Sequence, residues 1–159
     1  AICWGLQVAV TVAGGIVKKC NKGAHRGIAH NVKINKNGLS HPLYKNKNEI
    51  FNTPAFNFDE VATLPNNSTL LSSNEINNVM GINFKCGVSD IWGIQYHPEI
   101  TYDKMITLIH FRKDRLLNNK AFIDEDEINT HVKMIAEENK ITNKDNRMKE
   151  LENWLNKII

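Results

Sequence analysis

A cysteine in a stretch that suits a sharp strand-to-helix turn constrains the fold of this chain most strongly. Cys3 stands in Ala-Ile-Cys-Trp-Gly-Leu-Gln, with the small residues Ala1 and Gly5 two positions before and after it. A turn that exposes a nucleophile between a strand and a helix is crowded and needs small residues at these positions. The apolar residues that follow predict a buried helix over residues 8–13, ended by the glycines at 14–15. The stretch therefore indicates an α/β architecture.

The same turn gives Cys3 the surroundings of a reactive thiol. The dipole and free N–H groups at a helix N-terminus favour a thiolate there. The backbone N–H of Trp4 would point at the oxygen of a carbonyl under attack and form half of an oxyanion hole. From this stretch alone, an ordinary buried thiol in front of a core helix remains an open alternative.

A histidine after a second apolar stretch offers the base that a thiol nucleophile needs. Residues 91–96 are apolar enough for a strand, and His97, Pro98 and Glu99 follow them. Pro98 fixes a turn, and Glu99 is near enough in the chain to orient the imidazole. Because functional groups converge at strand ends in α/β sheets, we expect His97 and Glu99 to lie near one another and near the nucleophile.

The remaining chain divides into a strand-rich part and a helical part. Strands are predicted over residues 16–19, 28–34, 49–52, 69–72 and 90–96, loops over 21–26 and 64–67, and a turn at 37–38. Apolar residues at helical spacing predict helices from Tyr102 through Leu116, over 124–139 and over 143–159. We expect an α/β domain over residues 1–112 and a helical C-terminal extension over 113–159, whose apolar stripe packs on its own domain.

Composition argues against several other classes of protein. The net charge of +3 is mild and the lysines are scattered, so we expect no nucleic-acid partner. Three cysteines without paired spacing favour a reducing cytoplasm over a disulfide framework. The apolar N-terminal stretch is too short to span a membrane. Since no metal-ligand or phosphate-loop motif is present, we expect no metal and no cofactor.

Taken together, Cys-Trp-Gly-Leu-Gln and the later Trp-Gly-Ile-Gln-Tyr-His-Pro-Glu resemble the class I glutamine amidotransferases. These are the triad-type glutaminase domains, and the GMP-synthetase-like members are the most similar in motif. The resemblance covers roughly residues 1–100. It implies the flavodoxin-like fold of that family, represented here by its C-terminal portion from the nucleophile onward.

The resemblance also implies a role for individual residues. Cys3 would attack the side-chain carboxamide of glutamine, and His97 would take the thiol proton and pass a proton to departing ammonia. Glu99 would orient His97, while Gly5 and Gln7 would shape the glutamine pocket. Water would then release glutamate from a γ-glutamyl thioester. In the family, the ammonia passes to a synthetase or transferase partner.

Two features depart from the family pattern. The segment over residues 56–61 often reads Ser-His-x-Asp-x-Val in GMP-synthetase-like members, and Asn57 stands where that histidine would be. Asn57 and the adjacent Phe58 are therefore candidates for the pocket wall. No Gly-rich loop that would complete the oxyanion hole is present, and losing one such donor costs about 10²–10³ in rate. We expect the chain to be the C-terminal two-thirds of an amidotransferase, weak or inactive alone.

Two other functions remain open. A γ-glutamyl peptide hydrolase would use the same Cys-His-Glu triad without a synthetase, and substrate choice would distinguish it. A catalytically inactive pseudoenzyme subunit would regulate or scaffold a partner through the helical tail. Replacing Cys3 by alanine would leave that role unaffected and would abolish any glutaminase.

Overall fold

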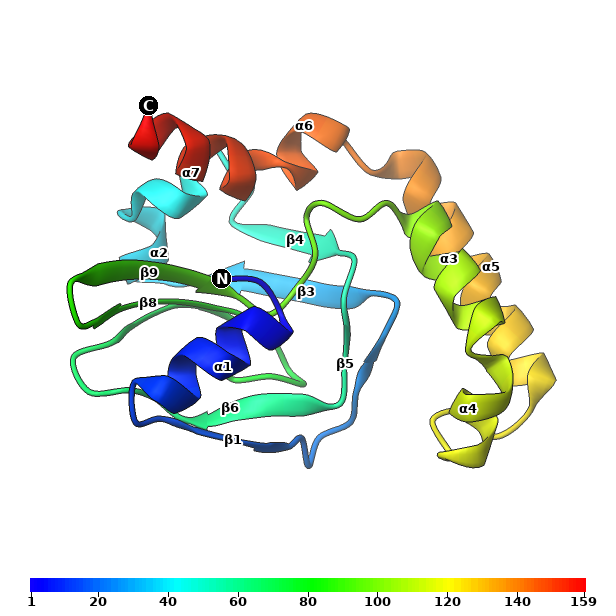
Figure 1. Ribbon diagram of the computed structural model, residues 1–159. Helices are drawn as coiled ribbons and strands as arrows, with labels where there is room; N and C mark the ends of the chain where they lie inside the picture. Colours follow the sequence, from blue (N-terminus) through cyan, green and yellow to red (C-terminus); the bar gives the residue numbers. More distant parts are fainter.

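A five-stranded sheet in the order β4-β3-β7-β8-β9 is the centre of the fold in the computed structural model, which describes residues 1–159 (Figure 1). Its neighbouring strands all pair antiparallel. The strands are β3 (Ala29–Ile34), β4 (Ile50–Thr53), β7 (Thr69–Ser73), β8 (Gly81–Cys86) and β9 (Ser89–Ile94). Two smaller pairs are β1 (Ile16–Lys19) with β6 (Asp59–Thr63), and β2 (His25–Arg26) with β5 (Phe56–Asn57).

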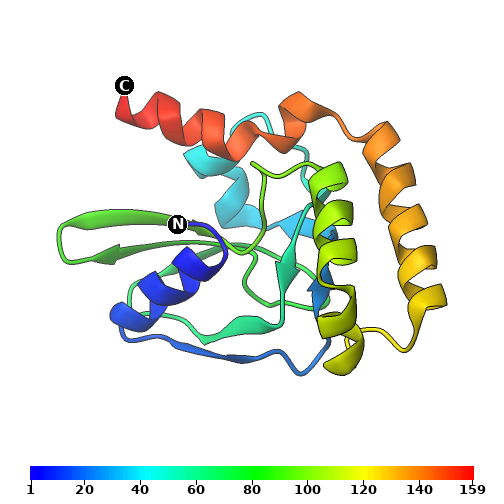
Figure 2. The same ribbon diagram turned by 45° about the vertical axis from the view of Figure 1, so that its right-hand side comes forward.

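The helices lie around this sheet and confirm the mixed α/β architecture with a helical C-terminal part. They are α1 (Trp4–Val12), α2 (Lys36–Leu39), the 3₁₀ helix η1 (Pro42–Tyr44), α3 (Tyr102–Phe111), α4 (Lys113–Asn118), α5 (Glu125–Ile141), α6 (Lys144–Arg147) and α7 (Lys149–Ile158). Helices α3 and α5 run side by side at one end, and α6 and α7 return across the sheet toward η1 (Figures 1 and 2). No helix has both the length and the apolar character needed to cross a membrane.

Helix α1 covers the sheet with one face only. Leu6 and Val10 are fully buried in a cluster with residues of β6 and β8. Trp4 and Val12, by contrast, are 74% and 72% exposed. The prediction of a wholly buried helix over residues 8–13 is therefore wrong in both extent and burial, because the helix begins at Trp4 and only its inner face meets the sheet.

The glycine pair ends α1 as predicted. The N–H of Gly15 donates to the carbonyl of Val10 at 2.8 Å, and the N–H of Gly14 donates to that of Thr11 at 3.1 Å. Gly14 has a φ of 85°, in the left-handed region that favours glycine. This is a Schellman motif, which satisfies carbonyls at the helix end and turns the chain into β1.

All five predicted strands are present, although their ends shift by a residue or two. The prediction misses β8 and β6, which carry charged and amide residues on their outer positions, and the two-residue strands β2 and β5, of which β2 lies in the expected 21–26 loop. The turn expected at 37–38 is instead part of α2. The reason is a helix cap: the side chain of Asn35 accepts from the N–H of Gly38 at 2.9 Å.

Candidate active site

The first three residues run beside the end of β9 and place Cys3 at the start of α1. The N–H of Ile94 donates to the carbonyl of Ala1 at 2.9 Å, and the N–H of Cys3 donates to the carbonyl of Ile94 at 2.8 Å. Ile2 forms a parallel bridge with Ile94. Cys3 has a φ of 50° and a ψ of −110°, a conformation that costs a non-glycine residue about 1–3 kcal/mol. This is the strained strand-to-helix turn that the sequence predicts.

The pairing with β9 also brings the candidate base to the cysteine. His97 follows three residues after Ile94, and its Nδ1 lies 2.6 Å from Oε1 of Glu99. The backbone N–H of His97 donates to the carbonyl of Pro54 at 2.8 Å, and this hydrogen bond holds the backbone of His97 in place. His97 and Glu99 therefore pair with each other just beyond the strand end to which the Cys3 backbone is bonded.

The surroundings of His97 favour its protonated form. Burial alone would lower the pKa of the imidazole, but hydrogen bonds and charge interactions with Cys3 and Glu99 outweigh burial and raise the pKa to about 9. An imidazolium beside a cysteine sulfur is typical of sites where a thiolate attacks and the histidine protonates the leaving group.

We predict that Glu99→Gln lowers the pKa of His97, because the amide removes the negative charge that favours the imidazolium. An NMR titration of the His97 ring should give a midpoint near 9 in the unaltered protein and a lower one in the variant. Since this pKa is raised from 6.5, the interaction stabilises the fold fully below pH 6.5 and is lost as the pH rises through about 9. Glu75→Gln, an exposed control, should leave the midpoint unchanged. Midpoints near 6.5 in all three proteins would contradict the triad geometry.

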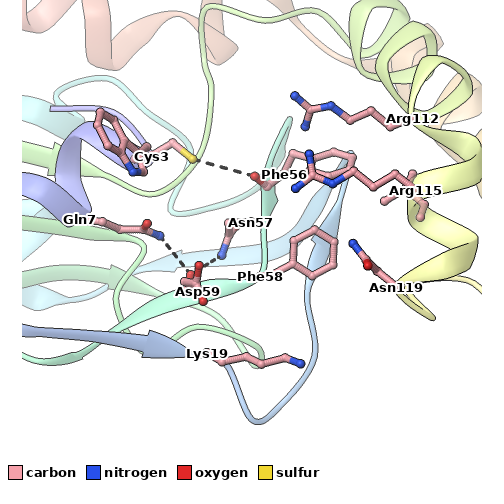
Figure 3. Close-up of a pocket in the computed structure, with 12 residues that line it drawn as sticks. Cys3, Gln7, Lys19, Phe56, Asn57, Phe58, Asp59, Arg112, Arg115 and Asn119 are labelled. Carbon is pink, nitrogen blue, oxygen red and sulfur yellow. Dashed lines mark hydrogen bonds between the residues drawn. The ribbon is translucent and has the colours of Figure 1, made fainter.

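A cavity of about 460 Å³ opens beside the cysteine (Figure 3). One wall comes from α1, a second from β5 and β6, and a third from the junction of α3 and α4. It is lined by Cys3, Trp4, Gln7, Lys19, Phe56, Asn57, Phe58, Asp59, Arg112, Arg115, Leu116 and Asn119. No group of three or more His, Cys, Asp or Glu side chains is placed to hold a metal ion.

Two of the predicted pocket residues are held in place by the same backbone carbonyl. Nε2 of Gln7 donates to the carbonyl of Asp59 at 3.2 Å and to Oε1 of Gln95 at 3.3 Å. Nδ2 of Asn57 donates to that same carbonyl and to Oδ1 of Asn77, both at 3.0 Å. Gln95, fully buried, also donates to Sγ of Cys3 at 3.6 Å. Sequence reasoning gave Gln95 no role, although it lies in the same motif as the histidine.

The other predicted residues take different positions. Phe58 lines the cavity with Asn57, whereas Gly5 does not. A Cβ at Gly5 would meet nothing within 4 Å, so crowding within this chain is not what favours glycine there. The N–H of Trp4 makes no backbone hydrogen bond and remains available as a donor at the helix start.

The helical tail contacts the loop that carries the histidine. Arg147, on α6 and 8% exposed, donates to the carbonyl of Pro98 and, at 2.9 Å, to that of Ile100. These carbonyls flank Glu99 on either side. Sequence reasoning missed this contact, because a single arginine in a polar helix nearly fifty residues away gives no signal of its partner.

Comparisons with known proteins identify the family of this chain. The family model of glutamine amidotransferase class-I matches residues 1–113. A gamma-glutamyl-L-1-hydroxyisopropylamide hydrolase from Pseudomonas sp is 33% identical over 103 residues, which cover 63% of this chain and 35% of that enzyme. A glutamine-hydrolyzing GMP synthase from Thermosipho africanus is 30% identical over 141 residues, which cover 85% of this chain and 26% of the synthase.

The fold has a counterpart among solved structures. A glutamine amidotransferase from Thermotoga maritima superimposes with a TM-score of 0.68 at 20% identity, covering 94% of this chain and 58% of that one. The chain thus spans about a quarter to a little over half of the length of these relatives. With the family match over most of its length, the chain belongs to the class I glutamine amidotransferase family.

Proposed function

We propose that the protein hydrolyses glutamine to glutamate and ammonia through a γ-glutamyl thioester on Cys3. The observation that carries this proposal is Cys3 on a strained turn at the cavity, with the paired His97 and Glu99 beside it though not in the cavity lining. Gln7, Asn57 and Phe58 line the cavity and would contact the bound glutamine. A synthetase or transferase partner takes up the ammonia, as the name of the GMP synthase relative suggests.

The geometry supports the following sequence of steps. The sulfur of Cys3 attacks the γ-carbonyl carbon, and the N–H of Trp4 donates to the oxygen that becomes negative. The imidazolium of His97 gives its proton to the nitrogen, so the C–N bond breaks and ammonia leaves. Neutral His97 then takes a proton from water, whose oxygen attacks the thioester and releases glutamate and the sulfur. Glu99 stabilises the imidazolium at both ends of the cycle.

Trapping the thioester tests this proposal. Glutamine turnover in the presence of hydroxylamine should yield γ-glutamyl hydroxamate at the expense of glutamate, because hydroxylamine competes with water for the thioester. The hydroxamate should be absent when Cys3 is replaced by alanine. Glutamate release with no hydroxamate at any hydroxylamine concentration would contradict a covalent intermediate.

A γ-glutamyl amide hydrolase is the second candidate function. Two observations favour it: the relative from Pseudomonas is named as a hydrolase of such an amide, and the cavity of about 460 Å³ lies in the range of roughly 300–1,000 Å³ that holds drug-sized ligands. The ratio of kcat/KM for a γ-glutamyl alkylamide to that for glutamine decides between the two. A ratio above 1 favours the amide hydrolase, and a ratio far below 1 favours the glutaminase.

We predict that Arg147→Met lowers kcat about 10²-fold with little change in KM, because a misplacement of about 1 Å in a catalytic group costs that much. The substitution removes the donors that hold the loop between His97 and Ile100. Lys144→Met is the matched control, since Lys144 lies on the same helix, is exposed and makes no side-chain hydrogen bond. Equal kcat values for the two variants would contradict a positioning role for Arg147.

A further inference from the structure

We propose that Arg112 and Arg115 form a subsite for a carboxylate group of the substrate, across the cavity from Cys3. The inference rests on the proposed function, because it names a second group on the same γ-glutamyl substrate. Neither residue belongs to the motifs that identify the family, and Arg115 lies beyond the region that the family model matches.

The two arginines are the only ones in the chain without a polar partner. Arg26 pairs with Glu127 at 3.1 Å, and Arg147 donates to two backbone carbonyls. Arg112 and Arg115 make no side-chain hydrogen bond and no ion pair. The guanidinium of Arg112 lies over the ring of Phe56 at 5.6 Å, which leaves its N–H groups free.

The helices hold both guanidinium groups at the cavity. Arg112 is the junction between α3 and α4, and Arg115 follows one turn later on the same face. Leu116, 2% exposed, anchors α4 in a cluster against Phe56 and Phe58. In Figure 3 both arginine side chains extend from the helices toward Phe56, on the side of the cavity that faces Cys3.

The charges of the cavity favour an anionic ligand. Its lining holds three cationic side chains, of Lys19, Arg112 and Arg115, and one carboxylate, of Asp59. Like charges one helical turn apart repel each other, and an anion between them removes that cost. A guanidinium fork matches a carboxylate with two parallel hydrogen bonds. The ligand class is therefore a γ-glutamyl compound with a carboxylate at the end away from the attacked carbon.

Such a carboxylate has two sources, which the substrates of the test distinguish. One is the α-carboxylate of the glutamyl group itself, present in glutamine and neutralised in glutaminamide. The other is a carboxylate on the leaving amine, present in γ-glutamylglycine and neutralised in γ-glutamylglycinamide. We would measure kcat/KM for all four compounds with the unaltered protein, with Arg112→Gln and with Arg115→Gln.

Replacing an arginine should lower kcat/KM about 10- to 100-fold for the compound whose carboxylate that arginine binds, as expected for the loss of a charge-assisted hydrogen bond. The matching neutral amide should change less than twofold. Lys104→Gln, an exposed lysine on α3 outside the cavity, is the matched control and should leave all four values unchanged. Equal losses for the charged and neutral member of each pair would overturn the subsite.

Binding to the Cys3→Ala variant separates this inference from the proposed function. Calorimetric titration with glutamate and with γ-glutamylglycine should show Kd values about 10- to 100-fold higher for the double variants, in which Arg112→Gln or Arg115→Gln is combined with Cys3→Ala, than for Cys3→Ala alone. That result supports the subsite even if the protein hydrolyses neither compound. Absence of binding, or Kd values that the arginine substitutions leave unchanged, would overturn the subsite while leaving hydrolysis through Cys3 intact.

Discussion

Cys3→Ala should reduce kcat for glutamate release by a factor on the order of 10⁶, the loss seen when a nucleophile that forms a covalent intermediate is removed. The reason is chemical, because alanine has no atom that can bond to the γ-carbonyl carbon. His97 and Trp4 would remain in place, so the residual rate would reflect water attack on a bound substrate. Glutamate release by the two proteins is compared at saturating glutamine.

Cys86→Ala is the matched control for this prediction. Cys86 is also a free cysteine but lies at the end of β8, outside the cavity. Its replacement should leave kcat unchanged within about twofold. Equal rates above background for Cys3→Ala and the unaltered protein would exclude a thioester mechanism, and background rates for both would favour the pseudoenzyme interpretation.

Glu150→Ala should lower the free energy of unfolding by about 3–5 kcal/mol, the cost of leaving one charge of a buried pair without its partner. Oε2 of Glu150 lies 3.0 Å from Nζ of Lys47, and both side chains are 1% exposed. Oε1 of Glu150 accepts from the hydroxyl of Tyr96 at 2.6 Å. Removing the carboxylate would leave the buried Lys47 ammonium without a counter-charge, with backbone carbonyls as its remaining partners, and the Tyr96 hydroxyl with Tyr44 alone.

A pair on the same helix serves as the control for Glu150. Oε2 of Glu152 lies 2.7 Å from Nζ of Lys149, but the side chain of Glu152 is 44% exposed and that of Lys149 is 26% exposed. Glu152→Ala should therefore cost about 0–1 kcal/mol. Denaturant unfolding at neutral pH measures both values, and equal small losses would contradict a buried ion pair. Replacing Glu150 and Lys47 together by methionine should recover most of the stability, because no charge is then left unpaired.

This buried pair has a consequence for the active site. Tyr96 directly precedes His97, so the bond from Tyr96 to Glu150 ties the end of β9 to α7. Arg147 ties the following loop to α6. Helices α6 and α7 therefore contact the segment that carries the candidate base at two points. Loss of these helices should affect both folding and the placement of His97.

The geometry around Cys3 could be predicted from the sequence because each part is encoded locally. A cysteine before an apolar helix and a His-Pro-Glu after an apolar strand are contiguous motifs. Their meeting point depends on the parallel bridge between Ile2 and Ile94, which places the turn at Cys3 beside the end of β9. The glycines that end α1 are local in the same sense, because left-handed backbone at Gly14 suits that residue.

The tail could not be predicted in the same way. Its spacing predicts an apolar stripe that includes Leu151 and Leu155, yet the residue of α7 that is buried is Glu150, while Leu155 remains 46% exposed. A periodic pattern identifies a helix but not the buried ion pair that will hold it, because the partner, Lys47, is distant in sequence. Arg112 and Arg115 give no signal in the sequence for the same reason, since the residues that share the cavity with them are distant in the chain.

Covalent labelling of the chain by a diazo-ketone analogue of glutamine, read by intact mass, tests the central claim most directly. Labelling needs the nucleophile and its pocket but not full turnover, so it does not depend on a second oxyanion donor. We predict one adduct that maps to Cys3, is absent in Cys3→Ala and forms more slowly in the presence of glutamine. A folded chain that forms no adduct, or one that is labelled equally at Cys20 or Cys86, would contradict the assignment of Cys3 as the nucleophile.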